Sequence, residues 1–461
     1  MSLAGAFIVP HPPIIIPEIG KGEERKISKT IESYREIAKR IGELKPDTIV
    51  ISSPHTIMYS DYFHISPGTG ASGDFGAFGA KQVSFQVDYD EEFTETLEDM
   101  AERAGVEAGT LGEKNPELDH ATMVPLYFID EFLEKYKIVR IGLSGRSYQE
   151  HYRLGKCMKQ TEQKLGRKVV IIASGDLSHK LKTDGPYGYA PEGVRFDQEV
   201  TRAMEEGNFL KFLEFSPDFC ELAAECGLRS FLIMAGAFDG KKVMSRLLSY
   251  EGPFGVGYAV ASFEELGMEE DRNFDKIFED KQRAYARRLQ ELEDSYVHLA
   301  RRSLETYIIT GKYAKLPEDL PGELLGRRAG VFVSLKKHGG LRGCIGTIAP
   351  VTACIAKEIM KNAVSAAVED PRFPPVTEQE LSDLIYSVDV LAEPEPITSM
   401  SELDVKRYGV IVTAGRKRGL LLPNLEGIDT VEHQVAIAKK KAGIYDNEQF
   451  NLERFEVVRH K

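Results

Sequence analysis

The sequence predicts two α/β domains, the first built on a mostly parallel central sheet flanked by helices and the second of mixed α and β structure. At 461 residues the chain is too long for one ordinary domain. From Ala4 to about Phe263, apolar strand-like runs alternate with amphipathic stretches, which is the pattern of an α/β sandwich. A densely charged segment, 267–284, follows. We therefore expect domains at 1–266 and 285–461, joined by a charged linker.

The first domain carries the regular part of this pattern. Ile49, Val50 and Ile51 are contiguous and β-branched, as in a strand covered on both faces. A glycine-rich stretch between two short runs predicts a hairpin with a loop. The expected strands are 4–10, 48–54, 62–66, 83–89, 137–144, 168–174, 243–249 and 255–262. The expected helices are 23–43, 91–104, 121–135, 148–165, 195–215 and 217–237.

The second domain restarts with an amphipathic helix, because apolar residues recur every three or four positions from Val297 to Ile308. Gly311 is expected to end this helix. Beyond it we expect two strands joined at 338–340, a helix at 351–367 and one more strand.

Composition excludes several classes of protein. The formal net charge of −13 argues against a general nucleic-acid surface, which would be basic. No apolar run reaches the roughly 18–20 residues of a membrane span, and the N-terminus lacks the features of a signal peptide. The five cysteines form no CxxC pair, which argues against a disulfide framework and a structural zinc site. We expect a cytoplasmic protein without nucleic-acid or membrane partners. Whether it forms a homo-oligomer stays open.

Three histidines follow three of the expected strands. His11 and His55 come directly after a strand and a proline, and His179 comes five residues after Ser174. The carboxyl ends of neighbouring parallel strands share one edge of a sheet, where open α/β folds bind ligands. A lone histidine at such a place is more often structural, but three predict one shared site.

A fourth histidine opens an expected helix. Asp119 is placed to cap that helix, so His120 would lie in its first turn. The helix dipole disfavours a charged imidazole at this position. A neutral ring could donate to a substrate oxygen or bind a metal.

The residues leave the third metal ligand open. Two imidazoles and one carboxylate form the metal-binding triad of non-heme Fe(II) oxygenases. Glu225 is the candidate carboxylate, since it lies in an otherwise apolar stretch among small residues. The alternative is that Glu225 is solvated at the edge of a helix.

Five short segments together resemble the class III extradiol ring-cleavage dioxygenases, of the catalytic beta-subunit type, over roughly residues 4–263. They are "VPHPP" (9–13), "SSPHT" (52–56), "DHATMVPL" (119–126), "SGDLSH" (174–179) and "ECGLRS" (225–230).

The resemblance implies that His11, His55 and Glu225 bind Fe(II), that His179 is the acid/base, and that His120 orients substrate and oxygen. The same segments resemble the Memo-like proteins, in which a cysteine takes the place near the third ligand. This chain has Cys226 next to Glu225, so either residue could complete the site.

A second set of segments, from about 285 to the end, resembles the AMMECR domain. They are "LRGCIG" (341–346), "EDPRFPPVT" (369–377), "SVDVL" (387–391) and "GRKRGLLLPNL…TVEHQV" (415–435). The resemblance implies no chemistry, but it implies an association with Memo-like and radical-SAM proteins. From the residues alone, Arg342 beside Cys344 could make a reactive thiol. The alternative is an inert cysteine in a packed turn.

Two functions follow as expectations. The first is a non-heme Fe(II)-dependent extradiol-type dioxygenase that cleaves a catechol-like or aminophenol-like ring with O₂. The second is a Memo-like module that binds a metal or a peptide without ring cleavage and acts with the AMMECR domain and a radical-SAM partner. The sequence does not identify the aromatic substrate, because the residues that would line a substrate site follow no motif.

Overall fold

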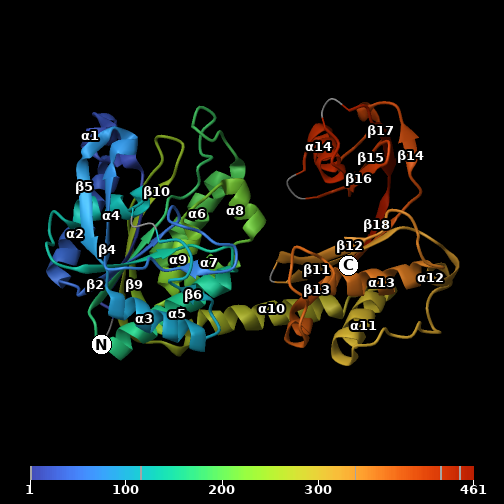
Figure 1. Cartoon of the computed structure of the whole chain (residues 1–461), viewed down its shortest axis with the longest axis horizontal. Helices are drawn as coiled ribbons and strands as arrows, with labels where there is room; N and C mark the ends of the chain where they lie inside the picture. Colours follow the sequence, from blue (N-terminus) through green and yellow to red (C-terminus); the bar gives the residue numbers. More distant parts are fainter. Residues whose placement is uncertain (1–2, 115–116, 338, 426–427, 446–447) are drawn as a thin grey trace. The chain divides into compact units, whose positions relative to one another are not determined.

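The computed structural model describes residues 3–114, 117–337, 339–425, 428–445 and 448–461 (Figure 1). The chain divides into two compact units, 1–279 and 280–461. Among the described residues, no helix combines the length and the apolarity that crossing a membrane requires.

The first unit contains a six-stranded sheet, which confirms the expected α/β class with a mostly parallel sheet. Its strands lie in the order β7 (Lys137–Gly142), β2 (Thr48–Ser53), β8 (Val169–Ser174), β1 (Gly5–Val9), β10 (Tyr258–Met268) and β9 (Lys241–Glu251). The first four are parallel to one another, while β10 and β9 are antiparallel additions at one edge. The carboxyl ends of β2, β8 and β1 are therefore neighbours.

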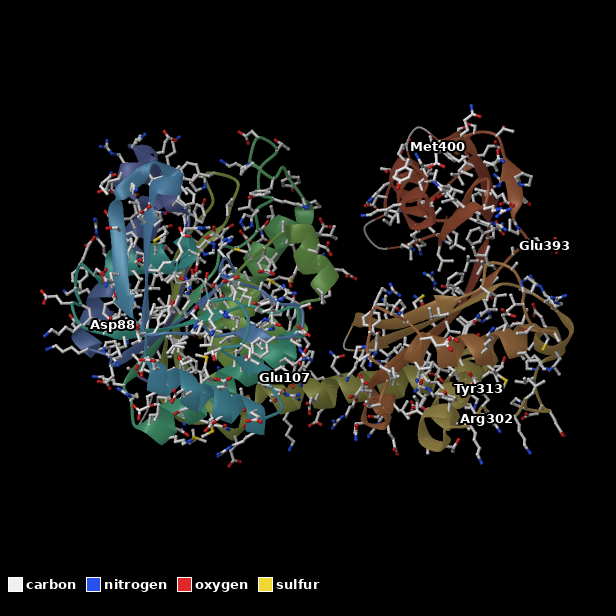
Figure 2. The ribbon with its side chains drawn as sticks, viewed as in Figure 1. Asp88, Glu107, Arg302, Tyr313, Glu393 and Met400 are labelled. Atoms are coloured by element: carbon white, nitrogen blue, oxygen red, sulfur yellow. The ribbon has the colours of Figure 1, made fainter. Side chains whose placement is uncertain are left out.

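Both faces of this sheet are covered, as the β-branched strands predict. Successive residues of β1 alternate between two cores: Ala6 and Ile8 pack into one, and Phe7 and Val9 into the other. Side chains fill the space on both sides of the sheet (Figure 2). The first core contains residues from α3 (Glu91–Arg103), α5 (Tyr148–Leu165), α6 (Pro191–Glu206), α7 (Phe209–Glu214), α8 (Pro217–Ala223) and α9 (Leu228–Gly236). The second contains residues from α2 (Ser28–Leu44) and α4 (His120–Ile129).

Two expected helices are divided in two. The expected helix at 195–215 is split into α6 and α7. The helix at 217–237 is broken between Ala223 and Leu228, where Ala224 adopts a left-handed conformation with φ of 52°. This break places Glu225 and Cys226 in a turn between α8 and α9 rather than on a helix.

The glycine-rich region forms more strand than expected. It contains the two-stranded hairpin of β4 (Gly70–Phe75) and β5 (Ala80–Asp88), with the short 3₁₀ turn η3 (Gly76–Phe78) at its tip. The expected strand at 62–66 is reduced to β3 (Phe63–His64), which pairs with β6 (Ala108–Gly109). Sheet pairing outweighs the low strand propensity of glycine here.

The segment expected to be a charged linker is mostly regular structure. It contains the end of β10 and the helix α10 (Phe274–Gln290), which runs through the point at which the chain divides. Phe274, Ile277 and Phe278 recur at helical spacing and pack on the first core, so this amphipathic pattern outweighs the high charge.

The second unit contains two four-stranded sheets with separate cores. The first has the order β12 (Gly340–Gly346), β11 (Val331–Lys337), β13 (Leu384–Leu391) and β18 (Val457–His460). The second has the order β14 (Glu395–Ile397), β17 (Asn451–Phe455), β15 (Gly409–Ala414) and β16 (Lys417–Leu421). Its helices are α11 (Ser295–Thr310), α12 (Gly322–Gly326), α13 (Ile355–Val368) and α14 (Val431–Ala442). Gly311 ends α11 in a left-handed conformation, as expected. The expected turn at 338–340 begins at His338, which lies outside the described residues.

Candidate metal centre

Parallel pairing brings His11 and His55 together. Val9 pairs with Ser174, and Ser52 pairs with Ala173, so β1, β8 and β2 end side by side. The outer two of these strands, β1 and β2, are each followed by a proline and then a histidine, and the rings of His11 and His55 meet with their Nε2 atoms 3.1 Å apart.

Cys226 is the third donor of this group. Its Sγ lies 3.7 Å from His11 Nε2. The donor atoms of His11, His55 and Cys226 all lie within 4.8 Å of one another. His11 is buried, Cys226 is half-buried and His55 is exposed, so the group extends from the sheet edge to solvent. We refer to these three residues as the metal centre.

Two glycines bring Cys226 into place. A Cβ on Gly175 would lie 2.2 Å from Gly227 Cα, so the turn after β8 and the turn before α9 approach more closely than side chains would permit. The thiol accepts a hydrogen bond from the backbone N–H of Asp176 at 3.3 Å.

Glu225 is not brought to this group in the structure. Its carboxylate accepts a 2.7 Å hydrogen bond from the backbone N–H of Leu228, in the first turn of α9. Helix N-termini offer unsatisfied N–H groups that carboxylates bind well. Burial raises the pKa of Glu225. The expected helix over 217–237 has no break at Ala224, so it does not predict that Glu225 accepts a hydrogen bond at the start of α9.

The partners of His11 fix which of its nitrogens can bind a metal. The Ser174 hydroxyl donates to the carbonyl of Ala121 at 2.7 Å and lies 3.1 Å from His11 Nδ1. Since the hydroxyl proton is directed to that carbonyl, Nδ1–H donates to Ser174 and Nε2 keeps its lone pair. Such support by the second nitrogen is typical of metal-binding histidines.

His120 and His179 flank the metal centre. The His120 ring lies 4.3 Å from that of His55 and 5.5 Å from that of His11, between ring centroids. His179 Nδ1 donates to the carbonyl oxygen of Ala224, so its Nε2 is available as a proton acceptor. The structure thus brings four of the five predicted N-terminal site residues together.

All four histidines favour the neutral form. Burial, and then the nearby His55, lowers the pKa of His120 to about 4. His120 is in the first turn of α4, capped by Asp119 as predicted, and burial is the main cause of its low pKa. Desolvation also lowers the pKa values of His11, His55 and His179. Neutral imidazoles are the form that binds metals.

The donor set fits a metal ion. Burial raises the pKa of the Cys226 thiol well above its ordinary value, and Asp176 and Glu225 add to this. A bound cation would reverse that effect, because it stabilises a coordinating thiolate.

In the second unit, Arg342 and Cys344 have different partners. The Arg342 guanidinium binds Glu380 through two hydrogen bonds of 2.9 and 3.0 Å. The Cys344 thiol accepts a 3.2 Å hydrogen bond from the Ser334 hydroxyl, and Arg372 donates to its backbone carbonyl at 3.4 Å. Burial raises the pKa of Cys344. The sequence motif points to Arg342, whereas the guanidinium near Cys344 is that of Arg372.

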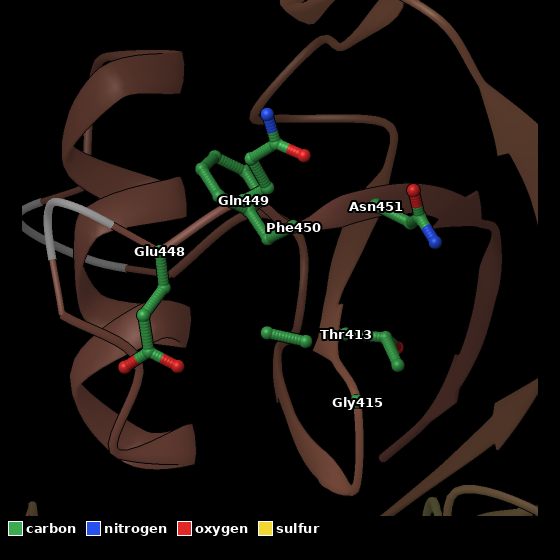
Figure 3. A pocket seen from close by; sticks show the side chains of 7 residues that line it. Thr413, Gly415, Glu448, Gln449, Phe450 and Asn451 are labelled. Atoms are coloured by element: carbon green, nitrogen blue, oxygen red, sulfur yellow. The ribbon is translucent and has the colours of Figure 1, made fainter.

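A surface hollow of about 610 Å³ lies elsewhere in the second unit (Figure 3). It is lined by Thr413, Ala414, Gly415, Glu448, Gln449, Phe450 and Asn451. Its acidic residue, Glu448, is paired with Lys417 at 2.6 Å, so the hollow offers no free charged group among its described residues.

Comparison with known proteins divides the chain in the same way. A family model described as the catalytic LigB subunit of aromatic ring-opening dioxygenase matches residues 5–261, and the AMMECR1 model matches residues 297–460. A Clostridium acetobutylicum protein, CA_C1420, is 45% identical over 471 residues, which cover all of both chains. A Thermotoga maritima protein is 52% identical over 171 residues, which cover 37% of this chain and 98% of that protein. The crystal structure of an uncharacterized Pyrococcus horikoshii protein, PH0010, is 35% identical, covers 37% of this chain and 90% of that chain, and gives a TM-score of 0.34.

Proposed function

The chain belongs to the family of the catalytic LigB subunit of aromatic ring-opening dioxygenases, with an AMMECR1 domain fused behind it as the sequence motifs predict, and from this premise we propose that its N-terminal domain is a metal-dependent oxidoreductase. The substrate that we propose is a small catechol-like or aminophenol-like aromatic, with O₂ as the oxidant. The observation that carries the proposal is the group of three donor atoms within 4.8 Å at the sheet edge.

We propose that His11, His55 and Cys226 hold one redox-active transition metal. A His₂Cys set differs from the His₂-carboxylate set of Fe(II) oxygenases, since a thiolate shifts preference toward softer ions such as copper. Fe(II) stays the candidate from the family resemblance. When bound, the metal would supply the activation of O₂ and of the phenolic oxygens.

The remaining histidines have proton-transfer roles in this proposal. His179 would accept a phenolic proton at Nε2, because its Nδ1–H is already donated to Ala224. His120 is neutral at pH 7 and would donate to a substrate oxygen. Its position in a capped first turn, 4.3 Å from the His55 ring, holds it beside the metal centre.

Metal analysis after anaerobic purification tests the proposal. We expect close to one iron or copper ion per chain, and O₂ uptake that depends on an added catechol or aminophenol. His55→Ala should lose most of the metal while the fold is retained, because His55 is exposed and contributes little to the core. Unchanged metal content in this variant would exclude the site.

A second candidate is favoured by the thiol itself. With Cys226 in place of a carboxylate, the domain resembles the Memo-like proteins, and it would then bind a metal or a peptide without cleaving rings. It would act with the AMMECR1 domain and a radical-SAM partner. Stoichiometric metal with no O₂ uptake across a panel of catechols and aminophenols would select this candidate.

A further inference from the structure

Two exposed aromatic side chains contact the histidines that flank the metal centre. The Phe78 ring lies 5.5 Å from the His120 ring, and the Tyr187 ring lies 5.1 Å from the His179 ring, between centroids. Both contacts are close to edge-on, at 67° and 82°. Phe78 is 42% exposed and Tyr187 is 60% exposed.

The two rings come from unrelated segments that are both held in place. Phe78 ends η3 at the tip of the β4–β5 hairpin, above the fully buried Phe75. Tyr187 lies between β8 and α6, in a segment closed by a bridge between Leu181 and Tyr189.

The hairpin is also pressed against the segment that leads to His120. A Cβ on Gly73 would lie 2.8 Å from Leu118 Cβ, so the backbone of β4 touches the residues just before α4. The position of Phe78 relative to His120 is therefore fixed by backbone packing rather than by the one ring contact.

Single exposed aromatics are common on protein surfaces. Here, however, two of them touch the two histidines that are not metal donors, and each touches a different one. His120 and His179 are half-buried, so their neighbouring rings lie where the cluster meets solvent. The exposed faces of Phe78 and Tyr187 are apolar. Covering them with the flat ring of a bound substrate would stabilise the complex.

We propose that Phe78 and Tyr187 contact the ring of the bound substrate and select for a flat aromatic. This inference rests on the proposed function, because that function supplies the aromatic substrate and its position beside His120 and His179. Neither residue donates to the metal, so their contribution is to ring binding alone.

The test measures the binding of 4-nitrocatechol by titration calorimetry, with full-length protein both metal-free and metal-loaded. Phe78→Ala and Tyr187→Ala should each weaken binding about 3- to 10-fold, the usual contribution of an aromatic pair. Tyr187→Phe keeps the ring and should bind as the wild type does. Metal content per chain should be unchanged in all three variants.

Matched controls are available at equal exposure. Phe132 is also 42% exposed and Tyr313, labelled in Figure 2, is also 60% exposed. Phe132→Ala and Tyr313→Ala should leave binding unchanged. The inference is overturned if the wild type does not bind the probe in either form, if the two alanine variants bind as tightly as the wild type, or if the controls weaken equally. Failure of the wild type to take up metal would instead overturn the proposed function, while the metal-free titrations still decide the roles of Phe78 and Tyr187.

Discussion

The Cys226 thiol lies 3.7 Å from His11 Nε2 and accepts a hydrogen bond from the Asp176 N–H. Burial keeps this thiol protonated without a cation, and burial likewise favours the protonated form of Glu225. Both groups accept a hydrogen bond from a backbone N–H, but it is the sulfur that lies within 4.8 Å of the donor nitrogens of His11 and His55. A metal ion at this place would therefore meet the sulfur first.

We expect Cys226→Ser to lower the metal content strongly, because a serine hydroxyl is a far weaker ligand than a thiolate. Glu225→Gln should keep the metal, since a glutamine oxygen can still accept from Leu228. Elemental analysis of both proteins after identical metal loading measures this. The opposite pattern would return the third position to the carboxylate and strengthen the case for Fe(II).

Cys344 should be slow to alkylate. Burial raises its pKa, so less thiolate is present at neutral pH than in an ordinary cysteine, and the labelling rate should keep rising beyond about pH 8.5. The Ser334 hydroxyl lowers this pKa by donating to sulfur, so Ser334→Ala should slow labelling by about 3- to 10-fold at fixed pH. Peptide mapping after timed iodoacetamide treatment measures the rate at which Cys344 is alkylated. Fast labelling at pH 7 would show an activated thiol instead.

At the scale of elements, the sequence correctly predicts the segments whose residues show a single clear pattern. The buried parallel strands follow from β-branched runs, and the convergence of His11 and His55 follows from parallel order. The break between α8 and α9 could not be predicted, because Ala224 adopts a left-handed conformation that alanine rarely takes. Tertiary contacts between Gly175 and Gly227 stabilise that turn, and no local pattern encodes them.

This close approach gives a prediction for Gly175→Ala. The added Cβ would lie 2.2 Å from Gly227 Cα, so the two turns must separate, at a cost of about 1–3 kcal/mol in the free energy of unfolding. Cys226 would move with its turn, and metal content should fall. Gly326→Ala is the control, since no atom lies within 4 Å of its Cβ, and it should change stability by no more than about 0.5 kcal/mol. Urea denaturation and elemental analysis measure both effects, and a stable, metal-replete Gly175→Ala protein would contradict the prediction.

At the scale of the whole molecule, the two units have separate cores, and α10 is the element that the expected boundary would cut away. Phe274 and Phe278 are buried against the first core although the segment around them is highly charged. The high charge of this region predicts a linker, because it obscures the helical spacing of the apolar residues, and the chain divides between residues 279 and 280.

A fragment of residues 1–290 should therefore be more stable than one of residues 1–266. Loss of the two buried phenylalanines alone would lower the free energy of unfolding by roughly 3 kcal/mol or more. Urea denaturation of the two fragments measures the difference. Within 1–290, Phe274→Ala should reproduce part of the loss, whereas Tyr285→Ala, at a 55% exposed position on the same helix, should not. Equal stability of the two fragments would restore the linker interpretation.

The donors of the metal centre are widely separated along the chain, since Cys226 lies 215 positions after His11. A ribosome must therefore complete nearly the whole first domain before the last donor emerges. An ion that needs all three donors cannot be captured by the nascent chain at His11 and His55 alone. If the site binds a metal as proposed, metal delivery in the cell is a late step that follows the folding of the first domain.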